Sequence, residues 1–323
     1  MVSRGYATPP SCCPASGYYP HCTGPVTHTI CDFLTLYRTE TITDPVLVVY
    51  EPRIYIVVQG EKVLYLHDRP ILYDESQYLI STLDLPVSGQ ITRASAAAPH
   101  LAVCISFSPS EINEIIRESQ TTHTNIPSPH SLHNTVTTAY PAMGLSNITD
   151  NILHALLRLV NLLDPDKNSH FLAQLYKKEL LYYFLHGQQG HVLRDIAQSH
   201  SDLSRINRAL NYLRHHFHEH FEMNTLVTIA GMGQSTFYKR FSELTGMTPV
   251  QYRTKLRLQE ARRLMVHEGT KAAHAGFLVG YDSPSQFSRD YKHIFGRPPH
   301  ADLQHIRTIG IEAYKRQHED VWF

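Results

Sequence analysis

A pattern that occurs twice, fifty residues apart, constrains this chain more than any other feature. The copies are Met232–Pro249, which follows Gly231, and Gly280–Pro299, and each reads as a glycine turn, a short helix with an aromatic face, a second glycine and a proline. The positions that match at a spacing of fifty are Ser235 and Ser285, Phe237 and Phe287, Phe241 and Tyr291, Gly246 and Gly296, and Pro249 and Pro299. A repeated supersecondary unit predicts two similar structures side by side in one helical domain.

The second copy shows why each unit should contain a helix. Ser283 is a good N-cap, Pro284 suits the first helical position, and Gly296 followed by prolines ends the segment. Apolar residues recur at helical spacing between these limits, at Phe287, Tyr291, Ile294 and Phe295. The opposite face is polar and basic. Such a helix fits the major groove of DNA, although a helix that only packs in a core shows the same periodicity.

Charge and composition set broader limits. Residues 1–189 carry 11 Lys and Arg against 16 Asp and Glu, whereas residues 190–323 carry 18 against 13. This asymmetry favours a polyanionic partner for the C-terminal part. Apolar runs fall short of the roughly 20 residues of a membrane span, and no basic and apolar export signal opens the chain. We therefore expect a cytoplasmic protein with reduced cysteines and no membrane partner.

The N-terminal part predicts a β-structure behind a disordered leader. Residues 1–30 are rich in Pro, Ser, Gly, Thr and Cys without periodicity. Seven short segments rich in Val, Ile, Leu and Tyr follow, at Val46–Tyr50, Ile54–Gln59, Lys62–Leu66, Arg69–Tyr73, Gln77–Ser81, Val87–Arg93 and Leu101–Ser106. Their close spacing indicates a sandwich or a small barrel. Its interior either holds a ligand or is simply packed, and the residues alone do not separate these alternatives.

Helices are predicted after the strands. Ser110–Glu118 is short, whereas Asn151–Leu163 and Phe171–His186 carry more apolar surface than one face can bury. Dimerisation and packing within the chain explain that excess equally well. From Leu203 onward helices are expected at Ser204–Glu219, Thr225–Ala230, Val250–His267, Lys271–Val279 and Ala301–Ile306, in addition to the two helices of the repeat.

Catalytic and metal-binding patterns are not evident. The β-region has no His-x-His pair with a later carboxylate, and no phosphate-binding loop or nucleophile elbow occurs. His215, His216, His218 and His220 lack a His-Glu-x-x-His arrangement and suit a solvated helix end. We therefore expect no catalytic residue, no metal site and no cofactor, and a protein that is not an enzyme.

The residues from Ile206 to Leu303 resemble the AraC/XylS family of transcriptional regulators. Arg257–Leu264, which reads RLQEARRL, is similar to the family's linker helix, and Gly280–Arg289 is similar to its second helix-turn-helix. A weaker resemblance covers Tyr50-Glu51-Pro52, Val58–Lys62, Tyr78-Leu79 and Asp84–Val87. These stretches are similar to the N-terminal domain of the AraC subgroup that controls alcohol dehydrogenase and aldehyde reductase genes.

The resemblance implies an α+β fold, with an N-terminal cupin-like β-barrel, a helical linker or dimerisation segment, and an all-α C-terminal domain with two helix-turn-helix motifs. The implied boundaries are a leader at 1–30, an effector or dimerisation domain at 31–145, a helical linker at 146–202, the DNA-binding domain at 203–310 and a tail at 311–323. The two motifs would lie at either end of the Val250–His267 helix and enter successive major-groove segments on one face of DNA.

Carried onto these positions, the resemblance implies a set of DNA-binding residues. In the first motif they are Ser235, Tyr238 and Lys239, with Gln234 and Thr236 beside them; in the second they are Ser283, Ser285, Gln286 and Arg289. Arg289 suits a bidentate bond to guanine and Gln286 suits adenine. Arg240, Lys292 and Arg297 are implied to neutralise phosphates.

Three positions depart from the family pattern. Gly233 stands where a capping Ser is usual, and Val227 and Gly276 stand at close helix contacts usually held by Ala. Gly caps a helix at a cost of a few tenths of a kcal/mol, Val forces a small adjustment, and Gly inside a helix costs about 1 kcal/mol. The second motif is therefore expected to be the better formed.

The expected function is a sequence-specific DNA-binding transcription regulator whose partner is double-stranded promoter or operator DNA. A small-molecule effector bound by the N-terminal domain, RNA polymerase and a second copy of the chain are further candidate partners. Two alternatives stay open: a cupin-type metal enzyme fused to a DNA-binding module, and a regulator whose N-terminal domain only dimerises. The effector, the operator and the direction of regulation are not determined by these residues.

Overall fold

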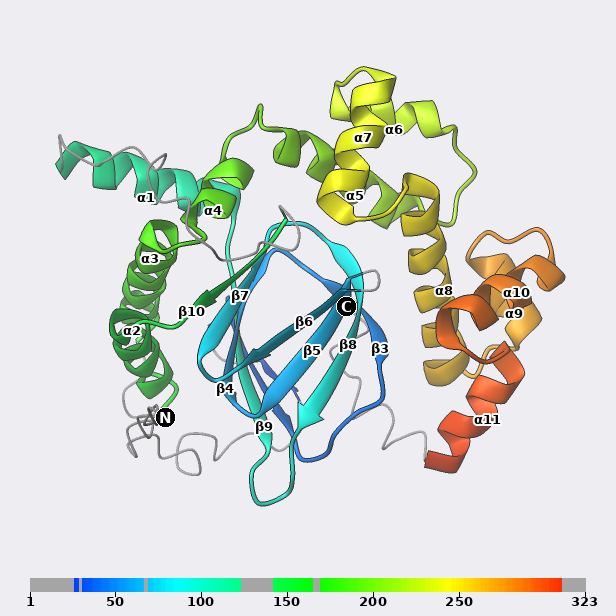
Figure 1. Ribbon diagram of the computed structural model, residues 1–323, viewed down its shortest axis with the longest axis horizontal. Helices are drawn as coiled ribbons and strands as arrows, with labels where there is room; N and C mark the ends of the chain where they lie inside the picture. The colour runs from blue at the N-terminus through cyan, green and yellow to red at the C-terminus, as the bar shows by residue number, and fades with distance from the viewer. Residues whose placement is uncertain (1–25, 29–30, 67–68, 123–141, 165–168, 310–323) are drawn as a thin grey trace, which may run out of the picture.

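The N-terminal half of the protein forms two antiparallel sheets that face one another (Figure 1). The computed structural model describes residues 26–28, 31–66, 69–122, 142–164 and 169–309. The first sheet has the order β1-β2-β9-β4-β7-β10 and the second β3-β8-β5-β6. Their bounds are β1 Val26–His28, β2 Leu34–Thr39, β3 Val46–Tyr50, β4 Arg53–Gln59, β5 Glu61–Leu66, β6 Arg69–Asp74, β7 Gln77–Ser81, β8 Leu85–Arg93, β9 His100–Ser106 and β10 Met143–Asn147. The sheets form a cupin-like sandwich, so the predicted α+β class is confirmed, with two separate sheets in place of a closed barrel.

All seven predicted strands are present with their ends within two residues of the expected ones, but the sequence analysis missed three others. β10 escaped because it is short and contains Gly and Asn, and it becomes a strand by pairing with β7. β2 pairs with β9 through six residues. β1 lies inside the expected disordered leader and pairs with β2, which corrects that expectation for Val26–His28. The rest of the leader, most of the expected polar loop and the tail at 311–323 lie outside the described residues.

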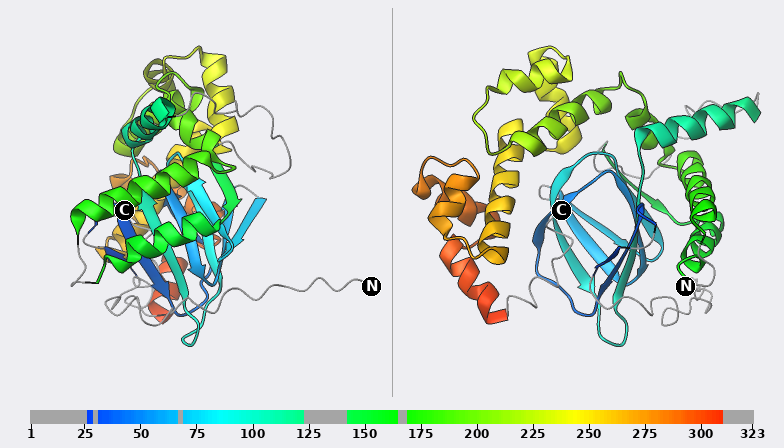
Figure 2. Two further views of the ribbon diagram at one scale, coloured as in Figure 1. Left: turned by 90° about the vertical axis from the view of Figure 1, so that its left-hand side faces the viewer. Right: turned by 180° about the vertical axis from the view of Figure 1, so that it is seen from behind.

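Four helices flank the sandwich: α1 Pro109–Thr122, α2 Asp150–Asn161, α3 His170–His186 and α4 Gly190–Ala197. α2 and α3 lie side by side on the flank opposite the C-terminal helices (Figure 1 and Figure 2). The sequence analysis missed α4, which begins at a glycine. A Cβ at Gly190 would come within 1.9 Å of the Leu185 carbonyl oxygen, so only glycine fits there.

The apolar excess of α2 and α3 is partly explained by packing within the chain. Ile152, Leu180 and Phe184 are buried in the core. Phe171 remains 71% exposed, and Leu175 and Tyr182 are exposed on the same helix. Intrachain packing therefore accounts for the inner face of α3 and leaves an outer apolar face uncovered in the monomer.

The C-terminal part is all helical, as predicted. Its helices are α5 Asp202–His216, α6 Met223–Ala230, α7 Gln234–Thr245, α8 Pro249–His267, α9 Ala272–Leu278, α10 Pro284–Phe295 and α11 Pro299–Ile309. The first half of α8, with Tyr252 and Leu256, joins a core that continues through α5–α7 and the N-terminal sandwich. The second half, from Leu258 to Met265, forms a separate core with α9 and α10. One long helix thus connects two small helical units, α6–α7 and α9–α10 (Figure 1).

Candidate DNA-reading surface and sandwich cavity

The two repeated units share the same backbone geometry at their turns. The helices of the two units, α7 and α10, carry most of the residues expected to contact DNA, and we call them the reading helices. Gly231 and Gly280 precede them with φ angles of 62° and 91°, and Gly246 and Gly296 end them with φ angles of 70° and 74°. These left-handed conformations favour glycine, which explains why the repeat keeps it at both ends.

The N-termini of α7 and α10 are capped differently, as the sequence predicts. The Ser283 hydroxyl accepts a hydrogen bond from the Gln286 backbone N–H at 3.4 Å, and Pro284 occupies the first turn. Gly233 is the N-cap of α7 and supplies no side-chain hydrogen bond. The predicted capping difference between the motifs is therefore confirmed at these two positions.

Gly276 was expected to destabilise its own helix, α9, and the structure shows that it also has a packing role. A Cβ there would come within 2.9 Å of the Phe287 ring, so glycine lets α9 approach α10 closely. Phe287 is fully buried as a result. The missing side chain at this position is what allows α10 to pack.

Arg257 of α8 holds the turn before α10 in place. Its guanidinium donates hydrogen bonds to the carbonyls of Phe217, at 2.6 Å, of Gly280, at 2.7 Å, and of Glu219, at 3.3 Å. It also lies over the Tyr281 ring, 5.8 Å from its centre. The five donors of arginine suit such a cluster of main-chain oxygens. The sequence analysis placed Arg257 in the linker helix but did not assign it this role, because its partners are distant in sequence.

Most of the expected DNA-binding side chains lie on the surface of α7, α10 and the turn after α10. The exposed ones are Gln234, Ser235, Thr236, Lys239, Arg240, Ser285, Gln286, Arg289, Lys292 and Arg297. Tyr238 and Ser283 are only half exposed. Tyr238 packs against the core and Ser283 caps α10, so these two side chains have structural contacts besides any contact with DNA.

Among the expected phosphate-binding residues, Arg240 already has acidic partners. Its Nε lies 2.7 Å from Asp202 of α5, and its Nη1 lies 2.7 Å from Glu243. The hydrogen bond to Glu243 and the charge of Asp202 raise the pKa of Arg240. Within the described part of the chain, Lys292 and Arg297 form no such ion pair. Arg240 is thus positioned by α5, whereas Lys292 and Arg297 extend freely from the second unit.

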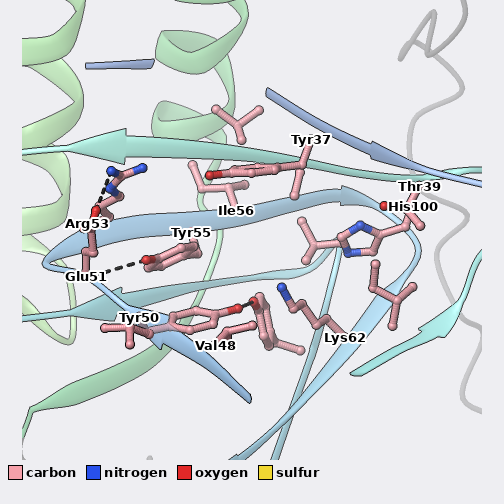
Figure 3. Close-up of a pocket in the computed structure, with 16 residues that line it drawn as sticks. Tyr37, Thr39, Val48, Tyr50, Glu51, Arg53, Tyr55, Ile56, Lys62 and His100 are labelled. Atoms are coloured by element: carbon pink, nitrogen blue, oxygen red, sulfur yellow. Dashed lines mark hydrogen bonds and ion pairs between the residues drawn. The ribbon is translucent and has the colours of Figure 1, made fainter. Parts of the chain in front are cut away.

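A cavity of about 310 Å³ lies between the two sheets of the sandwich (Figure 3). Its lining comes from β2–β6, β8 and β9 and the turn before β4. Figure 3 shows Lys62 and His100 toward one end, Glu51 and Arg53 at the other, and Tyr37, Tyr50 and Tyr55 between them. The sandwich interior is therefore not packed throughout, and ligand binding in the cavity stays a prediction.

Polar contacts order the walls of this cavity. The Tyr50 and Tyr73 hydroxyls are 2.9 Å apart, and the Tyr55 hydroxyl donates to the Glu51 carbonyl at 3.3 Å. Burial is the main cause that raises the pKa values of Tyr55 and Tyr73, so both phenols are neutral at physiological pH. Arg53 forms an ion pair with Glu51.

Glu51 also belongs to a contact between the sandwich and the C-terminal helices. Arg214 of α5 reaches Glu51 at 2.7 Å and Asp84 at 3.3 Å. The Tyr252 hydroxyl of α8 donates to the Asp84 main-chain carbonyl at 2.7 Å. Burial raises the pKa of the Asp84 carboxyl despite the opposing effect of Arg214. We call this group, Glu51, Asp84, Arg214 and Tyr252, the domain contact.

Two family models match the chain. The model for the AraC-type transcriptional regulator N-terminus matches residues 31–192, half of the chain, and a helix-turn-helix domain model matches residues 226–305. The chain belongs to the AraC family of transcriptional regulators. The expected family is thereby confirmed for both parts of the chain, whereas the subgroup that controls alcohol dehydrogenase and aldehyde reductase genes stays a prediction. The second match contains α7, α8 and α10 and hence both reading helices.

Curated relatives agree with the family but match only in part. The MmsAB operon regulatory protein of Pseudomonas aeruginosa is 29% identical over 116 residues, which cover 36% of this chain and 37% of that protein. The transcriptional activator RhaS of Escherichia fergusonii is 28% identical over 96 residues, 30% of this chain and 34% of that protein. The matched region thus spans little more than a third of these relatives' own length.

A solved structure supports the fold over most of the chain. ToxT from Vibrio cholerae superposes with a TM-score of 0.53, covering 84% of this chain and 97% of that one at 14% identity. At this identity the likeness concerns the fold alone.

Two absences concern the described residues only. Across the ranges given above, no group of three or more His, Cys, Asp and Glu side chains is arranged to hold a metal ion. None of the helices in those ranges is both long and apolar enough to cross a membrane.

Proposed function

We propose that this protein is a sequence-specific DNA-binding transcription regulator in which α7 and α10 enter successive major-groove segments of promoter DNA. The observation that carries the proposal is the pair of exposed reading helices attached to the two halves of α8. At 1.5 Å per residue, the 19 residues of α8 span about 28 Å. That length is comparable to one turn of B-DNA, roughly 34 Å. The DNA-binding domain would then comprise residues 203–310.

The proposed contacts follow from side-chain chemistry. Arg289 and Gln286, both exposed on the first turns of α10, are assigned to guanine and adenine edges. On α7, Lys239 takes the position that corresponds to Arg289, and Ser235 takes the one that corresponds to Ser285. Lys292 extends from the same helix as Arg289 and is assigned to phosphate, because an ammonium neutralises charge without reading a base. RNA polymerase is the further partner through which bound protein would change transcription.

We also propose that a small-molecule effector in the sandwich cavity controls DNA binding. The cavity and the domain contact share Glu51, so the sandwich interior adjoins the helices that carry the reading units. ToxT, a structural neighbour with a TM-score of 0.50 at 14% identity, was crystallised with (E)-4-(8-methylnaphthalen-1-yl)but-3-enoic acid. That ligand belongs to ToxT; the support in this chain is its own cavity.

The DNA proposal is tested with the full chain and no added ligand. Random duplexes are selected for binding, and the enriched sequence is compared with a scrambled one in a mobility-shift titration at a stated salt concentration. A specific regulator should bind the selected duplex about a thousandfold more tightly or better. Equal affinity for both duplexes would contradict sequence-specific binding.

Two variants separate base reading from phosphate binding. Arg289→Ala should cost about 1–3 kcal/mol on the selected duplex and relax discrimination at one base pair. Lys292→Ala, the matched control on the same helix, should weaken binding to all duplexes alike and reduce the salt dependence by about one phosphate contact. If Arg289→Ala lowers affinity for the selected and scrambled duplexes equally, Arg289 does not read a base.

A further inference from the structure

One end of the sandwich cavity contains two polar side chains, Lys62 and His100, for which the described residues supply no hydrogen-bond or ion-pair partner. His100 is 2% exposed, and neither of its ring nitrogens has a hydrogen-bond partner. Lys62 lines the same cavity and forms no ion pair with any acidic side chain that the structure describes; its ammonium lies 5.4 Å from the centre of the Tyr50 ring. A buried polar atom without a partner costs about 1–3 kcal/mol and calls for an explanation in a native structure.

The fold fixes His100 in this position. The chain passes from β4 in one sheet to β5 in the other at Gly60, where φ is +94° and an added Cβ would lie 3.1 Å from the Cα and Cδ2 atoms of His100. The neighbouring Gln59 side chain donates a hydrogen bond to the Pro99 carbonyl at 2.7 Å. The turn between β4 and β5 therefore packs directly against the His100 residue at the start of β9. This arrangement holds His100 in the cavity wall, where it is part of the lining.

The charge at this end of the cavity is positive. Glu51 is the acidic residue of the lining, and it is already paired with Arg53 and Arg214 at the other end. Burial, with the charges of Lys62 and Arg93, lowers the pKa of His100 to about 3. The imidazole is therefore neutral at physiological pH, so one ring nitrogen is an N–H donor. An ammonium and an N–H donor at one place form a site for an anionic oxygen.

The rest of the cavity is suited to an apolar or aromatic group. Tyr37, Tyr55 and Ile56 supply ring and aliphatic surface between the two ends (Figure 3), and Val103 is also part of the lining. A volume of 310 Å³ is at the lower end of the range for small-molecule sites and holds a ligand of about ten or more non-hydrogen atoms. Aromatic walls favour a flat body, because rings stack on such surfaces.

We propose that the cavity binds a small organic monocarboxylate with an aromatic or alkyl body, and that the Lys62 ammonium and the His100 ring N–H hold its carboxylate. This inference rests on the proposed effector control and names the chemical class of the effector. At the other end Arg53 and Glu51 are paired with each other, so that end does not offer a second carboxylate an unpaired cation. A cationic ligand would face Lys62 and is disfavoured.

The test is isothermal calorimetry on the full chain without DNA. The probe is 3-phenylpropionate, and the matched uncharged ligand is 3-phenylpropanamide, which has the same shape. We expect saturable one-to-one binding of the acid and at least about tenfold weaker binding of the amide, since a charge-assisted contact is lost. Hexanoate, probed in the same way, shows whether an alkyl body serves as well as an aromatic one.

Variants locate the carboxylate. Lys62→Met should weaken 3-phenylpropionate binding at least about tenfold, whereas Lys62→Arg, which keeps the charge, should retain most of it. Lys271→Met is the control, because Lys271 is exposed at the start of α9 and is not part of the cavity. His100→Leu should weaken the acid and leave the amide nearly unchanged. Near-ultraviolet circular dichroism confirms that each variant is folded.

Several outcomes would overturn the proposal: no binding of either acid at millimolar concentration, equal binding of acid and amide, or full binding by folded Lys62→Met. These results are independent of the DNA selection described above. A chain that selects a DNA sequence but binds no carboxylate keeps its proposed role as a regulator and loses this effector class. If the protein binds the acid through Lys62 but selects no DNA sequence, the carboxylate site stands and the proposed sequence-specific DNA binding fails.

Discussion

Replacing Arg214 with Met removes the cation that, among the described residues, lies within ion-pair distance of both Glu51 and Asp84 in the domain contact. Methionine keeps much of the aliphatic stem, so the change mainly removes charge. Glu51 retains its pair with Arg53, and the loss therefore falls mostly on Asp84. The Asp84 carboxyl is 3% exposed and stays buried after the substitution, since the Tyr252 hydrogen bond goes to its main-chain carbonyl.

The expected cost lies between two limits. Exposed ion pairs contribute about 0–1 kcal/mol, whereas breaking a fully buried pair costs about 3–5 kcal/mol. Arg214 is 40% exposed and Asp84 is 3% exposed, so the domain contact falls between these cases. We expect Arg214→Met to lower the free energy of unfolding by about 2 kcal/mol. Burial already raises the pKa of Asp84 in the intact protein, and without Arg214 it should rise further.

Urea unfolding of the single and double variants measures this effect. Asp84→Asn removes the buried charge, so Arg214→Met together with Asp84→Asn should cost less than the sum of the single changes by about 1 kcal/mol or more. Arg38→Met is the matched control, because Arg38 pairs with Glu40 at 2.9 Å on the surface and should cost at most about 1 kcal/mol. If Arg214→Met costs no more than Arg38→Met, or if the two changes are additive, the domain contact does not stabilise the protein electrostatically.

Two further predictions concern stability. Burial, with the charge of Lys62, lowers the pKa of His100 from 6.5 to about 3. Below pH 6.5 mainly the unfolded chain therefore binds this proton, and the free energy of unfolding falls as pH falls. His100→Asn should remove about 2 kcal/mol of the decrease in unfolding free energy between pH 7 and pH 5, measured by urea unfolding at each pH. Gly280→Ala should destabilise the second unit by about 2–4 kcal/mol, because its Cβ would lie 2.3 Å from the His218 carbonyl oxygen at a φ of +91°. The control is Gly269→Ala, at a φ of +68° with no atom within 4 Å of the added Cβ, which should cost only about 1 kcal/mol in the same unfolding assay.

The reading helices were predictable because their signals are local. Capping residues, turn glycines and an aromatic face all lie within twenty residues of one another, and the fifty-residue repeat supplied a second copy of the same evidence. The seven strands of the sandwich were likewise visible as short alternating runs. β1, β2 and β10 were not, since a short strand such as β10 exists through its pairing with a distant neighbour.

The cavity and the Arg257 contacts depend on longer-range geometry. His100 and Lys62 are 38 residues apart, and nothing near either residue marks it as part of a site. Arg257 reaches the Phe217 carbonyl forty residues away. No local pattern marks His100, because it becomes part of the cavity wall through the packing of the β4–β5 turn at Gly60 against it. Burial in the folded chain, and not sequence spacing, lowers the pKa of His100 and leaves its ring nitrogens without partners.

The N-terminal stretches that resemble the AraC subgroup gain a physical meaning from the structure. Tyr50-Glu51-Pro52 and Asp84–Val87 are two of these stretches, and they supply both carboxylates of the domain contact. Pro86 contributes its carbonyl to Lys255 of α8 at 3.5 Å. Val58–Lys62 contains the turn glycine that packs on His100 and the lysine of the cavity. Three stretches separated in sequence thus surround one cavity and one contact with α5 and α8. The contact between the sandwich and the C-terminal helices therefore depends on residues far apart in sequence, whereas the features of the reading helices follow from local sequence rules.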